Sequence, residues 1–329
     1  MIERKKDAAR IEAHLDSLRK ESWIGPARQW WPKYVFFFAE MQNAVRILRG
    51  GKLVCRSEAD MAVDTGSKQV LEHTDRQWKN TVRLYFRPRT PTQYQVEGFR
   101  PRGQYGSLGT HMPVPVFFLF DAKDILTRKS TRFSDGNLGA AGSVVSDDAD
   151  FFEAIPFRKV YHHSPLYSDG EKRNIVFHRC AEVIVPKELE LDALRAIWCR
   201  SEAEYQTLRH SLPSQILRKY SEKLLGRRSS LYFSKWSFVE RATLEQSKIK
   251  LGFNASTQKP GPFAAFLHVE NKTTGKRYKW EKNPFQAQET LTVNIPQIKK
   301  ACAYEVRFTL DGVTAFVGEF RPKPETAPF

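Results

Sequence analysis

The change of hydrophobic pattern near residue 229 constrains the fold of this 329-residue chain more than any other feature. Beyond it, apolar and polar residues alternate in short segments separated by turn residues, a pattern typical of strands with one buried face. The segments span residues 248–253, 263–270, 277–281, 290–295, 304–310 and 314–320. About 100 residues of this kind predict an immunoglobulin-like β-sandwich. Asp311 and Gly312 predict a hairpin turn between its last two strands.

The first 228 residues mix helical and strand patterns instead. Strands are predicted at residues 34–38, 53–55, 82–86, 114–120 and 181–185, and helices at 4–22, 41–48, 121–126, 189–197 and 202–217. Residues 131–150 are predicted to form a loop or short helix near a site, and 161–178 a polar, mobile stretch. The sequence therefore predicts an α+β protein, with a domain at 1–228 around a central mixed or antiparallel sheet and an all-β domain at 229–329.

The charge of the chain indicates its partners. Its 53 Lys and Arg against 37 Asp and Glu give a net charge of +16, which favours nucleic acid before an anionic membrane. No stretch approaches the ~18 to 20 apolar residues that span a bilayer, and the charged N-terminus lacks a signal core, so a cytoplasmic protein is expected. The cysteines are scattered without zinc spacing, so we expect no metal site.

An arginine–proline loop follows the strand at 82–86. Pro88 and Pro91 end the strand because proline donates no backbone hydrogen bond. The loop presents cations, hydroxyls and an amide that suit phosphates and ribose: Arg87, Arg89, Thr90, Thr92, Gln93 and Tyr94. Arg89 is the candidate for holding a phosphate of a cofactor or target strand, against the alternative of a solvated loop charge. Tyr94 and Gln93 are candidates for contacting a splayed base, and ordinary packing is the alternative for Tyr94.

A single acid interrupts the apolar strand at 181–185. Glu182 alternates with Ala181 and Val183, so a carboxylate is predicted within a buried strand. Such an acid suits the stabilisation of an oxocarbenium-like transition state and the acceptance of a proton from an attacking amine. The alternative is a structural acid that pairs with Arg179 or Arg83.

Four segments in order resemble the DarT family, bacterial toxins that transfer ADP-ribose from NAD onto bases of single-stranded DNA. They are FFFAEMQNAVRILRGGKLVCR at 36–56, YFRPRTPTQY at 85–94, FSDGNLG at 133–139 and HRCAEVIVPKEL at 178–189. The resemblance covers residues 34–210 and implies an ADP-ribosyltransferase-like fold for the N-terminal domain. The chain departs from the family's pattern at Phe37, where the family has histidine, and at Arg87, where it has asparagine. The sequence RPRTPTQY at 87–94 resembles that of the family's guanine-directed branch.

The resemblance also implies roles for individual residues, with NAD as the ADP-ribose donor and no metal. Glu182 and Arg89 are the expected catalytic residues. The expected cofactor contacts are Phe37, Asn43, Arg56, Arg76 and Arg179, with helix capping as the alternative for Asn43. Arg56 and Arg76 are alternative candidates for the one arginine that the family uses beside the dinucleotide. The expected substrate contacts are Arg87, Thr90, Thr92, Gln93, Tyr94 and His178.

The expected partners are single-stranded DNA or RNA and a cognate antitoxin, because the family's members are toxins, and an antiphage role is the related expectation. Sequence alone leaves other functions open. The chain could modify RNA or protein instead of DNA, or it could be a non-enzymatic single-strand-binding protein in which Glu182 is structural. The all-β domain carries no acid–histidine constellation, so recognition or stabilisation is its expected use.

Overall fold

The computed structural model describes residues 2–59, 61, 76–105, 111–166, 168–221, 225–288, 290–298 and 302–322. The chain divides into two compact units. Unit 1 comprises Met1–Gln95, Phe117–Ile197 and Lys223–Leu225, and unit 2 comprises Val96–Val116, Trp198–Glu222 and Gly226–Phe329. Unit 2 thus gathers two segments from the first 228 residues, while a domain boundary at residue 228 stays a prediction.

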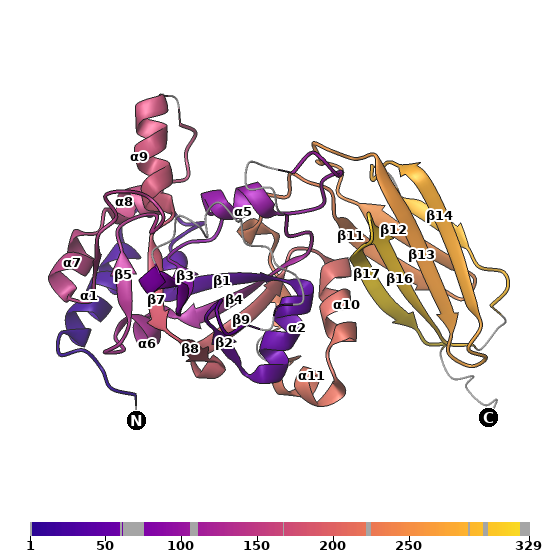
Figure 1. Ribbon diagram of the computed structural model, residues 1–329, viewed down its shortest axis with the longest axis horizontal. Coiled ribbons are helices and arrows are strands. Elements are labelled where there is room, and N and C mark those ends of the chain that lie inside the picture. Colours follow the sequence, from indigo (N-terminus) through magenta and orange to yellow (C-terminus); the bar gives the residue numbers. More distant parts are fainter. Residues whose placement is uncertain are drawn as a thin grey trace. The chain divides into compact units, whose positions relative to one another are not determined.

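The largest sheet has eight strands within the described residues, in the order β10-β9-β4-β1-β3-β7-β5-β6 (Figure 1). The strands are β1 (Tyr34–Glu40), β3 (Thr81–Tyr85), β4 (Pro115–Asp121), β5 (Arg132–Ser134), β6 (Val145–Ser146), β7 (Glu182–Pro186), β9 (Leu194–Cys199) and β10 (Leu225–Arg227). β4 is buried along nearly all its length, as its apolar sequence predicts for a central strand. β2 (Lys52–Val54) and β8 (Glu188–Glu190) form a separate antiparallel pair. The α+β fold with a large sheet is confirmed.

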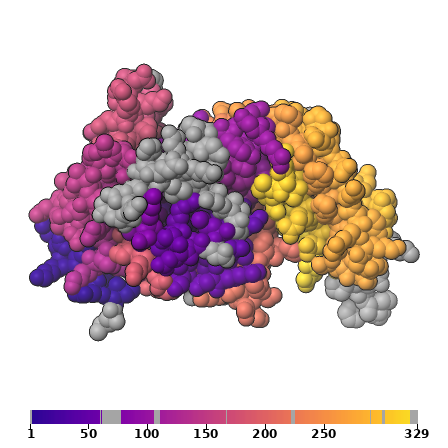
Figure 2. Space-filling view, viewed as in Figure 1, coloured from indigo at the N-terminus to yellow at the C-terminus, as the bar shows by residue number. Residues whose placement is uncertain are grey.

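Local sequence explains where the helices of unit 1 begin and end. α1 (Ala8–Leu18) buries one apolar face, as the spacing of its leucines predicts. α2 (Met41–Gly50) begins at the cap residue Glu40, and Gly51 ends it at φ 75°, a left-handed conformation that glycine adopts without strain. The other helices are η1 (Ser22–Ile24), η2 (Trp31–Lys33), α4 (Arg76–Lys79), α5 (Pro91–Val96), α6 (Ala122–Leu126), α7 (Ala149–Ala154), α8 (Phe157–Val160), α9 (Asp169–Arg179) and η3 (Leu191–Ala193). α9 packs against α8 and projects from the surface (Figures 1 and 2).

Unit 2 contains the two antiparallel sheets expected after residue 229. A three-stranded sheet has the order β11-β12-β15, and a four-stranded sheet has the order β14-β13-β16-β17. The strands are β11 (Val239–Glu245), β12 (Lys248–Phe253), β13 (Phe263–Asn271), β14 (Arg277–Phe285), β15 (Leu291–Asn294), β16 (Tyr304–Leu310) and β17 (Val313–Phe320). Phe253 of the first sheet contacts Phe308 of the second, with ring centroids 5.9 Å apart. Asp311 and Gly312 have φ values of 49° and 82° and join β16 to β17, which confirms the hairpin.

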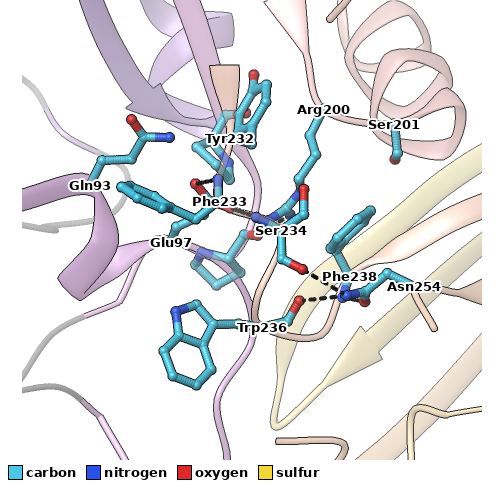
Figure 3. A network of polar contacts seen from close by, with 12 residues as sticks. Gln93, Glu97, Arg200, Ser201, Tyr232, Phe233, Ser234, Trp236, Phe238 and Asn254 are labelled. Atoms are coloured by element: carbon cyan, nitrogen blue, oxygen red, sulfur yellow. Dashed lines mark hydrogen bonds and ion pairs between the residues drawn. The ribbon is translucent and has the colours of Figure 1, made fainter. Parts of the chain in front are cut away.

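A buried ionic network ties three segments of unit 2 together (Figure 3). Arg200 pairs with Glu97, whose Oε1 lies 3.4 Å from Nη1, and with Glu204, to which Nε donates at 3.1 Å. Glu97 also accepts from the backbone N–H groups of Phe233 and Ser234 at 3.1 and 2.8 Å. Because these charged groups are fully buried, each depends on its partners, and the network fixes the segments that carry them.

Three secondary-structure predictions were wrong. Residues 189–197, expected to be a helix, form β8, η3 and the start of β9, because Leu189 and Leu191 are spaced at period two, although Leu191 and Leu194 have helical spacing. The stretch 161–178 contains α9, since Ser168 accepts from the N–H of Glu171 and caps a helix where a turn was expected. The helix expected at 202–217 is two helices, α10 (Glu202–Ser211) and α11 (Ser214–Ser221), separated at Pro213.

The β-strand β11 has no counterpart in the sequence prediction. The 3-10 helix η4 (Ser229–Leu231) precedes it.

Across the described residues, no helix combines the length and apolarity that a membrane span requires.

Candidate active site

Glu182 opens β7, directly after the corner that ends α9. It lies opposite Tyr85 in the antiparallel pair of β7 with β3, so both side chains share one face of the sheet. Glu182 is only 3% exposed, and its Oε2 lies 3.1 Å from the Nε of Arg83. Tyr85 is the last residue of the strand that leads into the arginine–proline loop. The structure therefore brings the buried acid and the start of this loop together.

The surroundings of Glu182 increase its basicity. Burial raises the pKa of Glu182, while the Arg83 guanidinium and the backbone N–H of Leu138 oppose the rise. The contact with Arg83 is an ion pair without hydrogen-bond geometry, and Oε2 has no hydrogen-bond partner among the described residues. A buried carboxylate oxygen in this state can accept a proton or hydrogen bond from a bound molecule.

A tight turn after β5 supports Glu182. Ser134 Oγ accepts from the backbone N–H of Glu182 at 2.9 Å and donates to the carbonyl of Gly136 at 2.7 Å. The backbone N–H of Asn137 donates to the carbonyl of Phe177 at 3.1 Å. Gly136 lies so close to the Phe177 ring that a Cβ atom would be 2.1 Å from Cε1. Segment 133–139 therefore packs between α9 and the strand of Glu182.

The arginine–proline loop is held by its own side chains. Arg89 has φ 58°, a left-handed conformation that is uncommon for a residue with a Cβ atom. Thr90 Oγ1 accepts from the N–H of Gln93 at 3.1 Å, and Gln93 Oε1 accepts from the N–H of Arg89 at 2.7 Å. This reciprocal arrangement resembles a capping box at the start of α5. Thr90 and Gln93 are buried and shape the loop, and their contact with substrate stays a prediction.

Arg87 is a buried cation that binds backbone carbonyls. It is 1% exposed, and its Nη1 donates to the carbonyls of Val160 and His162 at 2.8 and 2.6 Å. The guanidinium carbon also lies 5.1 Å from the ring centre of Trp31. These contacts tie the loop to residues 160–162, and a direct role of Arg87 in substrate binding stays a prediction.

Thr92 and Tyr94, the other predicted substrate contacts of the loop, lie on α5. Burial raises the pKa of both Tyr85 and Cys180, and hydrogen bonds with Thr92 oppose both shifts. Thr92 is therefore within reach of the residue opposite Glu182. Tyr94 is half-buried, and its N–H donates to the carbonyl of Thr90 at 3.0 Å.

His178 and Arg179 end α9, close to Glu182 along the chain. His178 donates from Nδ1 to the carbonyl of Asp135 at 2.7 Å. Arg179 donates from Nη2 to Nδ1 of His162 at 2.8 Å. The sequence named Arg179 and Arg83 as possible ion-pair partners of a structural Glu182. The structure shows the ion pair with Arg83.

Phe37, a predicted cofactor contact, and Phe38, the next residue of β1, pack against different aromatic rings. Its ring centroid lies 6.1 Å from that of Phe118, whereas Phe38 stacks on Tyr85 at 6.0 Å and 21°. Since side chains alternate along a strand, Phe38 is on the face that Tyr85 and Glu182 share. Sequence reasoning missed Phe38, which alternation along the strand places on the opposite face from Phe37.

The remaining cofactor predictions lie around α2 and beyond. Asn43 lies in the first turn of α2, but Glu40 is the cap, so the capping alternative for Asn43 was wrong. Glu40 accepts from the N–H of Gln42 at 2.6 Å, and burial raises its pKa to about 7. Arg56 lies in the turn after β2, and Arg76 begins α4, with its side chain outside the described residues.

Sequence reasoning also missed Ser134 and Glu40, and it treated Arg83 only as a possible ion-pair partner. Arg83 is two residues before Tyr85 at strand spacing, a signal that it faces the same side. Nothing in the sequence around Ser134 indicates that its hydroxyl receives the N–H of Glu182. Metal-binding groups of three or more His, Cys, Asp or Glu are absent from the described part of the chain.

The chain is similar to one family of known proteins and to several solved structures. A family model described as ssDNA thymidine ADP-ribosyltransferase, DarT, matches residues 36–233. Similar solved structures include Thermus sp. 2.9 DarT in complex with NAD+, at 16% identity and TM-score 0.47, over 61% of this chain and 98% of that one. The same protein in complex with ADP-ribosylated ssDNA also matches, at 16% identity and TM-score 0.48, over 61% of this chain and 97% of that one. Thermosipho africanus DarTG in complex with ADP-ribose matches at 13% identity and TM-score 0.47, over 65% and 54%. No curated protein matches the sequence.

Proposed function

The chain belongs to the DarT family of NAD-using, single-stranded-DNA ADP-ribosyltransferases, and from this premise we propose that Glu182 is its catalytic acid–base residue. The supporting observation is a buried carboxyl, opposite Tyr85, whose Oε2 is ion-paired with Arg83 but accepts no hydrogen bond from the described residues. A structural acid would be expected to have its oxygens fully bonded.

The proposed reaction uses this carboxyl twice. The bond between the anomeric carbon and nicotinamide breaks, nicotinamide leaves with the electron pair, and the Glu182 carboxylate stabilises the positive charge that develops on the ribose. An amine of the target base then bonds to the anomeric carbon, and its proton passes to Glu182. Burial favours this second step because a raised pKa makes the carboxylate a better proton acceptor.

The arginine–proline loop is proposed to position both substrates. Arg89 contacts a phosphate from a backbone conformation that its neighbours fix. The other proposed NAD contacts are Phe37, Asn43, Arg56, Arg76 and Arg179, and the proposed target-strand contacts are Arg87, Thr90, Thr92, Gln93, Tyr94 and His178. Phe38 joins the first group because it stacks on Tyr85.

The proposed base is guanine, although the family model is described by thymidine. The support is the sequence RPRTPTQY, which resembles the guanine-directed branch. The proposed biological role is that of a toxin held silent by a cognate antitoxin, within a toxin–antitoxin or antiphage system. This role rests on the resemblance to the family.

Substitution Glu182→Gln tests the catalytic proposal. It keeps the shape of the side chain and removes the charge, so NAD-dependent labelling of a single-stranded oligonucleotide should fall by about 100- to 10,000-fold. The affinity for the oligonucleotide should stay unchanged. The matched control is Glu188→Gln, an exposed acid on β8, the next strand along the chain. Unchanged labelling by Glu182→Gln would remove Glu182 from the mechanism.

Separate oligonucleotides with one type of reactive base test the guanine proposal. Each contains guanine, thymine, adenine or cytosine at a single position in an otherwise constant strand, and mass spectrometry locates the adduct. Label on guanine alone supports the proposal, and label on thymine assigns the chain to the thymine-directed branch. Matching RNA strands show whether the enzyme distinguishes the sugar.

A further inference from the structure

Residues 22–34 precede the region that the family model matches, which begins at residue 36. This short segment contains η1 and η2 and carries Trp23, Trp30 and Arg28, all half-buried. The segment therefore places two aromatic rings and a cation just before the matched residues.

The segment folds onto residues 160–163. Arg28 donates from Nη1 to the carbonyl of Tyr161 at 2.8 Å and from Nη2 to the carbonyl of Trp23 at 3.2 Å. The ring of Trp23 stacks on that of Tyr161, with centroids 6.5 Å apart and planes at 24°. Trp31 reaches His163, at 6.1 Å between ring centroids. The N-terminal segment and residues 160–163 therefore form one surface.

Several arginine side chains cluster around residues 160–163. The pKa of Arg87 is lowered, first by burial and then by the positive charges of Arg179, Arg89 and Arg28. Arg89 lies 3.4 Å from His163, whose pKa falls to about 4 through burial and the same arginines. Clustered cations in a partly buried site are costly unless an anion compensates them. The site thus favours binding of a polyanion.

We propose that Trp23, Arg28, Trp30, Arg89 and His163, named here the Trp–Arg surface, bind the target DNA strand beside the reacting nucleotide. The arginines contact phosphates, and the exposed parts of the tryptophan rings stack on bases. This combination of cations and aromatic rings is what proteins use to hold single strands. The surface extends the site of the proposed function, and it lies outside the family match in its N-terminal half.

The location argues for the target strand rather than for NAD. All members of a family that cleaves NAD need the NAD contacts, so these are expected within the matched region, residues 36–233. Trp23, Arg28 and Trp30 lie before it.

Binding of single-stranded DNA without NAD tests the proposal on the full chain. The probe is a fluorescent 12-nucleotide strand of mixed sequence, and anisotropy gives its Kd at several salt concentrations. Trp23→Ala should weaken binding by roughly 5- to 100-fold, and Trp23→Phe should restore most of it. Arg28→Gln should lower the slope of log Kd against log salt by about 0.7, the value for one phosphate contact on a single strand.

The control is Arg49→Gln, an exposed arginine at the end of α2, which should leave Kd unchanged. Thermal unfolding of each variant establishes that it is folded, and calorimetric titration gives its affinity for NAD. Unchanged DNA affinity in folded Trp23→Ala and Arg28→Gln would overturn the proposal. So would a loss of NAD affinity alone, which would assign the arginines to NAD.

Failure of the proposed function gives a different result. If the wild-type chain labels no oligonucleotide with NAD present, the transfer reaction is refuted. Loss of DNA binding in the two variants would still support the Trp–Arg surface, because binding is measured without NAD.

Discussion

Substitution Gly136→Ala tests the support that the turn after β5 gives to Glu182. A Cβ atom at this position would lie 2.1, 2.3 and 2.6 Å from three atoms of the Phe177 ring. Ordinary contact begins at 3.4 Å, so the ring or the turn would have to move by at least 1.3 Å. The carbonyl of Gly136 accepts a hydrogen bond from Ser134 Oγ, which in turn accepts one from the backbone N–H of Glu182. A movement of the turn therefore displaces Glu182.

The expected losses follow from these distances. Overpacking of this kind costs about 1 to 3 kcal/mol. This corresponds to a decrease in Tm of roughly 2 to 12 °C for a unit of this size. A displacement of about 1 Å at a catalytic group costs on the order of 100-fold in rate. Tm from circular dichroism and kcat from oligonucleotide labelling measure the two effects.

The double variant Gly136→Ala with Phe177→Ala should recover both properties, because it removes the ring that the new methyl group meets. Gly139→Ala is the control in the same loop, since its Cβ atom would lie 3.4 Å from the nearest atom, Oδ1 of Asn137. If Gly136→Ala behaves like Gly139→Ala, or if the double variant shows no recovery, the reasoning is refuted.

Three further predictions concern buried charges. Arg83→Met should move the acidic limb of the pH–rate profile to higher pH, because Arg83 lowers the pKa of Glu182. If the limb stays unchanged and KM for NAD rises, Arg83 is a substrate contact instead. Glu40 has a folded-state pKa of about 7, raised from 4.5 by burial, so the stability it contributes is present below pH 4.5 and is lost as pH rises through 7. Glu40→Gln should therefore raise Tm relative to wild type above pH 7 and not below 4.5, as measured by thermal unfolding in a pH series. Arg200→Met should destabilise unit 2 by about 3 to 5 kcal/mol in urea unfolding, because it leaves two buried carboxylates without their cation, and a loss below 1 kcal/mol would contradict this.

The elements that sequence predicted well are those with a strong local signal. The apolar run at 114–120 is β4, and the alternating segments after residue 229 are strands of two sheets. The wrong predictions concern weak or competing signals. Residues 189–197 carry leucines that fit both periods, and the Ser168 cap of α9 has the composition of a turn.

Sequence alone determined the α+β class and the positive charge, and it predicted Glu182 and the arginine–proline loop as site elements, because periodicity, proline and ionisable groups act locally along the chain. Tertiary structure alone decided what surrounds them. The register of β3 against β7 placed Tyr85 opposite Glu182 and Arg83 beside it, and the turn after β5 brought Ser134 to its backbone. These contacts join residues that are 48 to 99 positions apart in the chain. A local sequence pattern carries no information about such pairings.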